Sequence, residues 1–318
     1  MSTVRPAQRG LLFLGCLLAF VRWEPAPYDL FLIIIFLLYA RGLTWKSYQL
    51  VFVVLLGPLL FTHVPALGAA LEVAPERTLY YSLVTLYLAL SSVFFMSLPE
   101  RSVPLLLLGY EVGALLSGLL GVLAFLRIPG LEDLLWGGSR AVAFFKDPNV
   151  FGAFLIPALF LALARLEQGR KFWILPALIL FLGVLVSLSR GAWANFAVAL
   201  LAWWLLRPRK RIWLPLVLLT LAGGVGISVV VMPDNPIVQR LGFMPYDKER
   251  FFTQMEALSL ALTQPLGYGP GLSEIHLSYA THNTYVRFLA EVGWLGLFFW
   301  LLILGTSLTW SFSHGLMQ

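Results

Sequence analysis

The sequence predicts an all-α, polytopic membrane protein with about ten transmembrane segments. Of its 318 residues, 59% are hydrophobic and only 12% are charged, whereas soluble domains carry about 25% charged residues. The mean hydropathy is +0.85. Long apolar runs alternate with short charged breaks along the chain, which is the pattern of membrane helices joined by loops.

Composition also excludes several function classes. The net charge of +6 does not indicate nucleic-acid binding, because the cations lie in short breaks and form no basic stripe interleaved with aromatic residues. The single cysteine, Cys16, excludes an intramolecular disulfide, and the scattered histidines have no metal-ligand spacing. We therefore expect no metal, no cofactor and no nucleic-acid partner.

The chain begins with two apolar runs, residues 10–21 and 28–40, each short for a full crossing. They are either two short spans or a re-entrant hairpin, and in both cases the chain returns to its starting side. No small-x-small cleavage site follows the first run, which continues into Arg22-Trp23-Glu24-Pro25. We therefore expect an uncleaved first membrane segment and not a secretory signal.

The later apolar runs are expected to cross the membrane, since a spanning helix needs about 20 residues. They are residues 47–62, 78–98, 102–126, 148–164, 172–187, 191–206, 212–232 and 283–305. Residues 1–318 are thus expected to form a single membrane domain with two long loops, 127–147 and 233–282.

The distribution of Lys and Arg predicts that both termini are cytoplasmic. The expected inner breaks hold groups of cations such as Arg5 with Arg9 and residues 207–211, whereas the short outer breaks hold single cations such as Arg22 and Arg77. Both long loops then face the extracytoplasmic side.

The loop at 233–282 is predicted to contain short helices. An amphipathic helix is expected over residues 248–263, because Phe251, Met255, Leu258 and Leu262 recur at helical spacing on one face. It would lie along the membrane surface or cap the site. Pro265 ends it, and the glycines of Pro265-Leu-Gly-Tyr-Gly-Pro-Gly271 form a tight turn.

Polar residues able to do chemistry collect at the end of this loop. His282 is a base near neutral pH at the start of the last run, and Asn283 follows it. In the structural alternative, His282 is an interfacial residue and Asn283 is the N-cap of the helix.

Arginines supply the second candidate group. Arg190 interrupts an apolar region, where a cation either faces a partner or cavity or extends to lipid headgroups. Arg250 lies in the long loop, and Arg140 precedes Asp147-Pro148-Asn149 at the start of another run. Guanidinium groups match phosphate oxygens, so these arginines predict an anionic ligand.

Two acidic residues have simpler interpretations. Glu111 lies near the middle of a predicted span and needs a partner or a cavity. Glu291 follows Arg287 by four residues, the spacing of a helical ion pair, and we interpret that pair as structural.

Four motifs in order resemble those of the O-antigen ligase and polymerase superfamily of bacterial membrane glycosyltransferases, and together they cover about half of the chain. The motifs are Gly138-Ser-Arg140 with Asp147-Pro-Asn149; Ser189-Arg190-Gly191; Arg250 with Ala257 and Pro265-Leu-Gly-Tyr-Gly269; and His282-Asn283-x-Tyr285 with Glu291-x-Gly293-x-x-Gly296. The sequence departs from the family in having Gln254 where an aromatic residue is common. Family members also usually have two further spans after the histidine segment, so the chain ending at Gln318 is either a short member or a truncated one.

The resemblance implies transfer of a glycan from a polyprenyl-diphosphate carrier, without a metal, on the outer face of the bacterial inner membrane. The acceptor is a lipid A–core sugar in ligases and a lipid-linked repeat in polymerases. His282 would be the catalytic base or would position the acceptor, and Arg190, Arg250 and Arg140 would bind the diphosphate. Asn149, Asn283 and Tyr285 would support them, and membrane lipids would surround the protein.

A different function class remains open from the sequence. A transporter or lipid-linked glycan flippase would also be polytopic, and Glu111 inside a span favours it. Against it, the halves of the chain do not look related, as those of many transporters do. A peptidoglycan-polymerising relative is a further alternative, but its signatures are not found in the sequence.

Overall fold

A computed structural model describes residues 6–39, 43, 47–206, 245–277, 281 and 283–315. Within these residues the regular secondary structure is helical apart from a two-residue strand pair, β1 (Leu135–Trp136) with β2 (Arg140–Ala141). The predicted all-α class is confirmed. The chain divides into two compact units, one formed by Met1–Arg41 with Pro99–Phe243 and the other by Gly42–Leu98 with Met244–Gln318.

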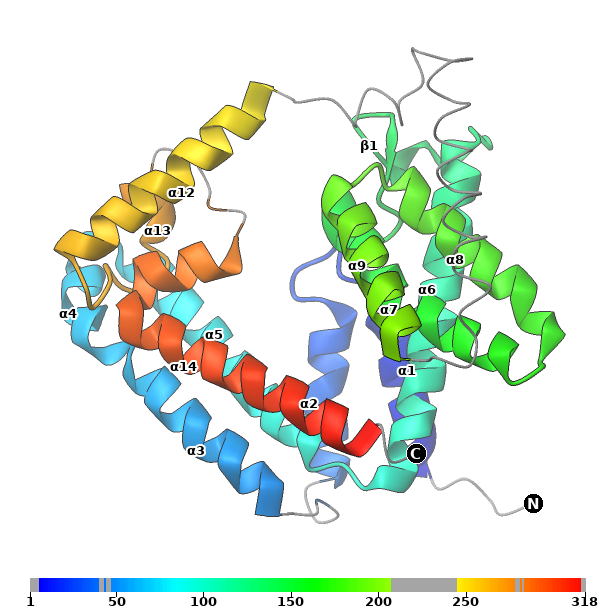
Figure 1. Cartoon of the computed structure of the whole chain (residues 1–318), viewed down its shortest axis with the longest axis horizontal. Coiled ribbons are helices and arrows are strands. Elements are labelled where there is room, and N and C mark those ends of the chain that lie inside the picture. Colours follow the sequence, from blue (N-terminus) through cyan, green and yellow to red (C-terminus); the bar gives the residue numbers. More distant parts are fainter. Residues whose placement is uncertain are drawn as a thin grey trace. The chain divides into compact units, whose positions relative to one another are not determined.

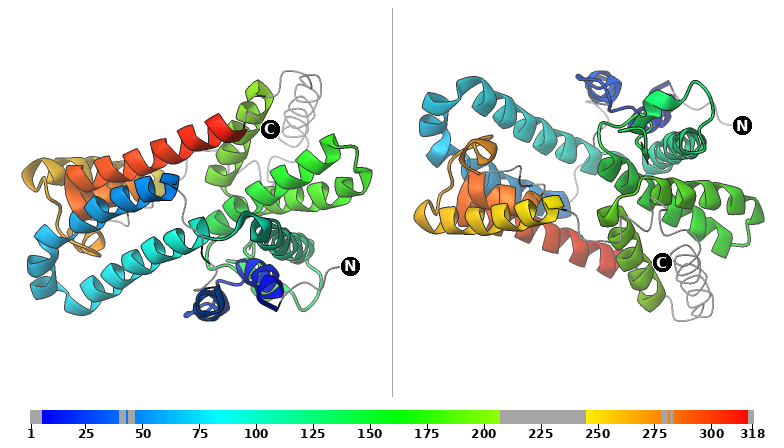
Figure 2. Two further views of the ribbon diagram at one scale, coloured as in Figure 1. Left: turned by 90° about the horizontal axis from the view of Figure 1, so that it is seen from below. Right: turned by 90° about the horizontal axis from the view of Figure 1, so that it is seen from above.

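The first unit holds six α-helices in its described part (Figure 1). They are α1 (Pro6–Leu17), α2 (Pro27–Tyr39), α6 (Val103–Phe125), α7 (Pro148–Glu167), α8 (Ile174–Val186) and α9 (Arg190–Leu206), with the 3-10 turns Glu100–Ser102, Glu132–Leu134 and Lys171–Trp173. Helix α1 lies beside α6 in every view (Figures 1 and 2). Gly109 and Gly113 permit this approach, because a Cβ at either position would collide with the backbone of α1.

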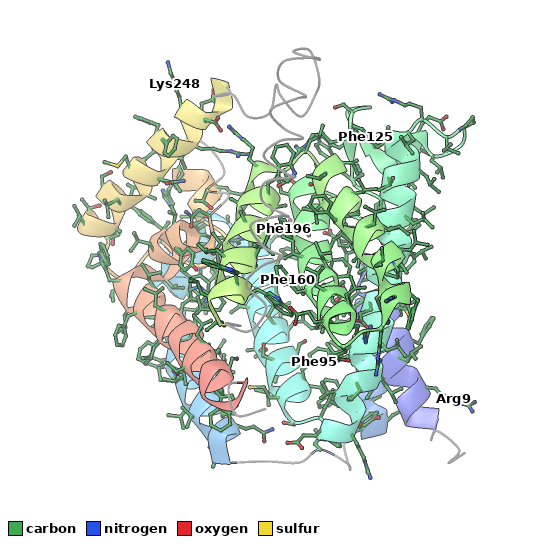
Figure 3. The ribbon with its side chains drawn as sticks, turned by 45° about the vertical axis from the view of Figure 1, so that its right-hand side comes forward. Arg9, Phe95, Phe125, Phe160, Phe196 and Lys248 are labelled. Carbon is green, nitrogen blue, oxygen red and sulfur yellow. The ribbon has the colours of Figure 1, made fainter. Side chains whose placement is uncertain are left out.

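The core of the first unit forms where α6, α7, α8 and α9 meet. Phe151 and Leu155 of α7 and Leu180 of α8 are almost fully buried there. Phe160 of α7 and Phe196 of α9 lie close together between these helices (Figure 3), with ring centroids 6.1 Å apart. This packing holds the starts of α7 and α9, which carry several of the predicted site residues.

Glu111 has its expected partner in this unit. Its carboxylate lies 2.5 Å from the Arg165 guanidinium of α7, which also stacks over Trp173 with 4.1 Å to the ring centroid. Glu111 is buried. Removal of one partner from a buried ion pair typically costs about 3–5 kcal/mol, so the pair accounts for an acidic side chain inside an apolar helix.

The second unit is built from helices at both ends of the sequence. They are α3 (Ser47–Phe61), α4 (Val64–Val73), α5 (Pro75–Met96), α12 (Pro245–Thr263), the short α13 (Ser273–His276) and α14 (Thr284–Gly315). The predicted loop helix is thus present, beginning three residues earlier than expected and ending at Thr263 before Pro265. In its first turns lie Asp247, Lys248 and Arg250.

By length and composition, four helices among the described residues can cross a membrane: α5, α6 with the turn before it, α7 and α14. A fifth span is possible if α3 and α4, bent by 42°, are taken together. Helices α2 and α8 are apolar but shorter. The predicted span over residues 212–232 lies outside the described residues, and the count of about ten remains a prediction.

Helix α14 is broken at Gly293, and the glycine-rich loop fills the break. Gly293 has φ 69° and ψ −167°, a conformation that is essentially restricted to glycine. The freed carbonyls of Ala290 and Glu291 accept hydrogen bonds from Tyr268 N (2.9 Å) and Gly269 N (2.9 Å), and Trp294 N donates to Pro265 O (3.1 Å). The loop therefore satisfies the backbone groups that an interrupted membrane helix would otherwise leave without partners.

Candidate functional site

The first candidate region is the corner where α7 and α9 begin, in the first unit. Asp147 caps α7 by accepting a hydrogen bond from Asn149 N (2.6 Å). Ser189 caps α9 in the same manner, with its hydroxyl oxygen 3.2 Å from Ala192 N. A Cβ at Gly152 would meet both the Ser187 side chain and Ala192, so glycine there lets the two helix starts approach each other.

Arg140 joins this corner. Its Nε donates to the carbonyl of Ser187 (3.2 Å), and one terminal nitrogen donates to the side-chain oxygen of Asn149 (3.1 Å). These contacts hold Arg140 beside the Ser187–Arg190 segment, where Leu188 has φ 49° and is buried. The structure thus brings together Arg140, Asn149 and the segment that carries Arg190.

The electrostatics of this corner favour an anion. The N-terminus of a helix carries a partial positive charge of about half a unit, and two such ends lie here. Arg140 and Arg190 add two partly exposed guanidinium groups against the single carboxylate of Asp147, which caps α7. Backbone N–H groups and guanidinium forks are the donors that phosphate oxygens prefer.

The second candidate region is the start of α14, in the second unit. Asn283 caps this helix, since its side-chain oxygen accepts from Tyr285 N (3.0 Å) and Val286 N (3.3 Å). The capping role considered from the sequence is therefore what the geometry shows. Tyr285 is half exposed. His282, which precedes Asn283 in the sequence, lies outside the described residues.

Arg250 belongs to the same end of this unit. Ala257 of α12 packs with Ala290 of α14, and Trp294 donates its indole N–H to the carbonyl of Ala261 (3.1 Å). These two contacts have the same sequence offset, so α12 and the first part of α14 run in the same direction (Figure 1). Arg250 lies seven residues before Ala257, on the same helical face, and hence at the end where α14 starts.

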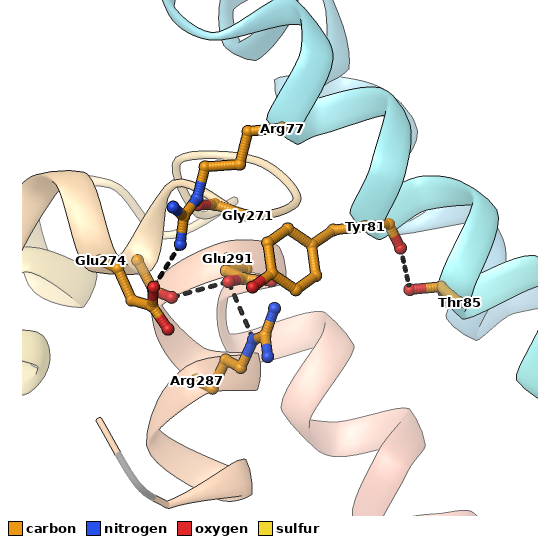
Figure 4. Close-up of polar contacts among 8 residues, drawn as sticks. Arg77, Tyr81, Thr85, Gly271, Glu274, Arg287 and Glu291 are labelled. Atoms are coloured by element: carbon orange, nitrogen blue, oxygen red, sulfur yellow. Dashed lines mark hydrogen bonds and ion pairs between the residues drawn. The ribbon is translucent and has the colours of Figure 1, made fainter. Parts of the chain in front are cut away.

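An ion-pair network lies one turn further along α14 (Figure 4). The carboxylate of Glu291 accepts from Ser273 Oγ (2.6 Å) and from Arg287 Nε (3.0 Å). Arg77 of α5 donates to the carbonyl of Gly271 (2.6 Å) and pairs with Glu274. Tyr81 stacks under both guanidinium groups. The Arg287–Glu291 pair expected from the sequence is confirmed, while Arg77, Tyr81 and Ser273 were not anticipated, since nothing in their spacing marks them.

This network explains why the glycine-rich loop is docked where it is. It ties the segment Gly271–Glu274 to α5 and α14, just before the chain reaches His282. Within the described residues, no three His, Cys, Asp or Glu side chains form a group that could hold a metal ion.

Comparison with known families decides the wider assignment. A family model described as O-antigen ligase matches residues 175–301. Over this range the chain is O-antigen ligase-like. The match contains Arg190, Arg250, His282, Asn283 and Tyr285, whereas Arg140 and Asn149 lie before it. No curated protein and no solved structure matches the chain.

The O-antigen ligase-like segment spans α8, α9, α12, α13 and α14. It therefore includes the α9 side of the α7–α9 corner, all of α12, and α14 as far as residue 301. Together with the apolar helices, the match supports a glycosyl-transferring membrane protein that functions in surface polysaccharide synthesis.

Proposed function

We propose that this protein transfers a glycan from a polyprenyl-diphosphate carrier to an acceptor sugar on the extracytoplasmic face of the bacterial inner membrane. The observation that carries the proposal is the O-antigen ligase match over 175–301, in a chain whose arginines and helix starts are suited to a phosphate-bearing donor. The acceptor is a lipid A–core sugar if the protein is a ligase, and a lipid-linked repeat if it is a polymerase. The proposal includes about ten spans, cytoplasmic termini and outward-facing long loops.

The proposed chemistry is a direct displacement with inversion. The acceptor hydroxyl oxygen forms a bond to the anomeric carbon of the donor glycan, and the bond from that carbon to the diphosphate oxygen breaks. His282 takes the hydroxyl proton as general base, and the electron pair of the broken bond leaves with the polyprenyl diphosphate. The leaving group gains negative charge, and fixed guanidinium groups stabilise such charge without a metal.

Each arginine has a proposed role that its surroundings support. Arg190 and Arg140 belong to the α7–α9 corner, where Asn149 orients Arg140 by accepting a hydrogen bond from it. Arg250 lies on α12 at the end where α14 starts, and His282 precedes α14 in the sequence. Asn283 supports the site by fixing the first turn of α14, and Tyr285 presents a partly exposed phenol on that turn.

The position of Glu111 no longer favours the transporter alternative. Glu111 inside a span raised the possibility of a transport pathway, but its carboxylate is paired with Arg165 in the core of the first unit. That pair gives Glu111 a structural role.

Single substitutions test the assignment. We expect His282→Ala, Arg190→Ala and Arg250→Ala each to lower glycan transfer in membranes by about 100-fold or more, the scale of a lost base or transition-state charge partner. Lys248→Ala is the matched control, because Lys248 is an exposed cation on the same helix as Arg250. Unchanged transfer by the three variants at normal protein levels would refute the proposed roles.

Glycan analysis of a deletion strain separates the two subclasses. If long chains vanish from the lipid core while carrier-linked polymer is still made, the protein is a ligase. If only single repeats are found, it is a polymerase. If purified protein moves lipid-linked glycan across vesicles but transfers no sugar, the function is transport and the proposal fails.

A further inference from the structure

Helix α12 presents three distinct faces. Its inward face is made of small side chains, Thr253, Ala257 and Ala261, all fully buried. Ala257 packs with Leu277 and Ala290 there. Small residues allow two helices to approach closely, so this face sets the rotation of α12 about its own axis and decides which side chains point outward.

The outward face is an apolar stripe. Phe251, Met255, Leu258 and Leu262 are 61%, 67%, 40% and 72% exposed. These positions are four, three and four residues apart and share one side of the helix. Beside the stripe lies a more polar flank, where exposed Lys248, Glu249, Ser259 and Thr263 surround one exposed aromatic residue, Phe252. The amphipathic face expected from the sequence exists, and it points away from the unit.

Helix α12 is not one of the helices that can cross a membrane. Its length of 19 residues would suffice at about 1.5 Å per residue, but Asp247, Lys248, Glu249, Arg250 and Glu256 make a crossing too costly. An apolar stripe with a charged flank is the pattern of helices that lie in the plane of a membrane surface.

An exposed apolar surface of a span lies beside the C-terminal part of α12. Trp294, on α14 after the break, bonds through its indole N–H to Ala261 at the C-terminal part of α12. The rest of its side chain is exposed, as are Leu295 and Phe298 further along α14. Tryptophan is enriched where a membrane meets water, because its ring is apolar and its N–H is polar. Exposed apolar side chains of α14 therefore begin beside the C-terminal part of α12.

We propose that α12 lies in the interface of the lipid bilayer, with Phe251, Met255, Leu258 and Leu262 among the acyl chains and the polar flank toward water. Lys248 points outward from the start of the helix (Figure 3), where it can meet anionic lipid headgroups. The occupant of the stripe is the bilayer itself. Arg250 is then held at headgroup depth on the inward side, where it could bind the diphosphate of a lipid-linked donor. Only this role of Arg250 rests on the proposed function.

Depth-dependent quenching tests the proposal with the full-length protein. Cys16 is the single cysteine, so Cys16→Ser provides a background for Met255→Cys and Leu262→Cys on the stripe. Ser259→Cys and Thr263→Cys are matched controls, because they are exposed on the same helix but lie on the polar flank. Each variant is labelled with a small fluorophore and reconstituted into phosphatidylcholine–phosphatidylglycerol vesicles without any glycan donor.

We expect lipids brominated in their acyl chains to quench the two stripe labels several-fold more than the two control labels, and iodide in the buffer to show the reverse order. Equal iodide quenching at all four positions would overturn the proposal. Protection of the stripe from both quenchers would also overturn it, since a second protein copy would then cover the stripe. Because no sugar transfer is measured, the result is independent of the proposed enzymatic function.

Discussion

Asn283 shows how much a single residue's role depends on geometry. From the sequence it was both a supporting residue of the site and a candidate helix cap. The structure places its side-chain oxygen against the first backbone N–H groups of α14. An oxygen used in this way fixes the helix start, and this role does not depend on catalysis by His282.

Substitution of Asn283 should therefore follow capping ability. Asn283→Ala is expected to lower the free energy of unfolding by about 1 kcal/mol, whereas Asn283→Ser and Asn283→Asp should retain most of it. Thermal unfolding of the purified variants in detergent measures the difference, and glycan transfer should rank the variants in the same order. If the Ser variant is as stable as wild type but inactive, Asn283 contributes more than a cap.

Ion pairs within one helix can be predicted from the sequence, whereas ion pairs between helices cannot. The Arg287–Glu291 pair was predictable because four residues along a helix bring side chains together, and the structure contains it. For Glu111 the sequence required only that some partner exist, and its identity, Arg165, depends on how α6 and α7 pack. Long-range partners leave no periodic signal.

At the scale of elements, the sequence predicted α12 and the glycine turn but not why they belong together. Helical spacing located the helix, and Pro265 located its end. The role of the loop depends on Gly293, where the backbone of α14 is broken. The break leaves the carbonyls of Ala290 and Glu291 free to accept hydrogen bonds from Tyr268 N and Gly269 N. The glycine-rich loop and the segment around Gly293, about 25 residues apart, are thus joined by backbone hydrogen bonds.

A helix break of this kind should tolerate no side chain. Gly293→Ala is expected to destabilise the protein by about 3 kcal/mol or more, because φ 69° with ψ −167° is a glycine conformation and the added Cβ would collide with Pro265 O. Gly305→Ala in the same helix is the control. It meets nothing within 4 Å and should be neutral or stabilising by up to about 1 kcal/mol. Comparable unfolding temperatures for both variants would contradict this account of the break.

For the whole molecule, the division into units was not predictable. Each unit combines segments that are far apart in the sequence, and apolar runs look alike whether they pack with one neighbour or another. Composition indicated the membrane class, and the ordered motifs indicated a likeness to O-antigen ligases that the match over residues 175–301 supports, because neither depends on how the helices pack. Which helices share a core is a property of three-dimensional packing, and a single sequence does not record it.

The contact between Arg77 and Glu274 tests this interleaved arrangement. The two residues are 197 positions apart and join the early and late segments of the second unit. Their side chains are 34% and 41% exposed, so a double-mutant cycle with Arg77→Gln and Glu274→Gln should give a coupling of only about 0.5–1 kcal/mol.

Arg77→Gln also removes the hydrogen bond to Gly271 O. It should therefore lower the free energy of unfolding more than Glu274→Gln does, and it should expose the loop at 264–277 to limited proteolysis. A zero coupling with unchanged cleavage would show that this contact does not hold the late segment against the early one. A larger loss of stability for Arg77→Gln than for Glu274→Gln would show that Arg77 fixes the loop chiefly through the loop backbone at Gly271.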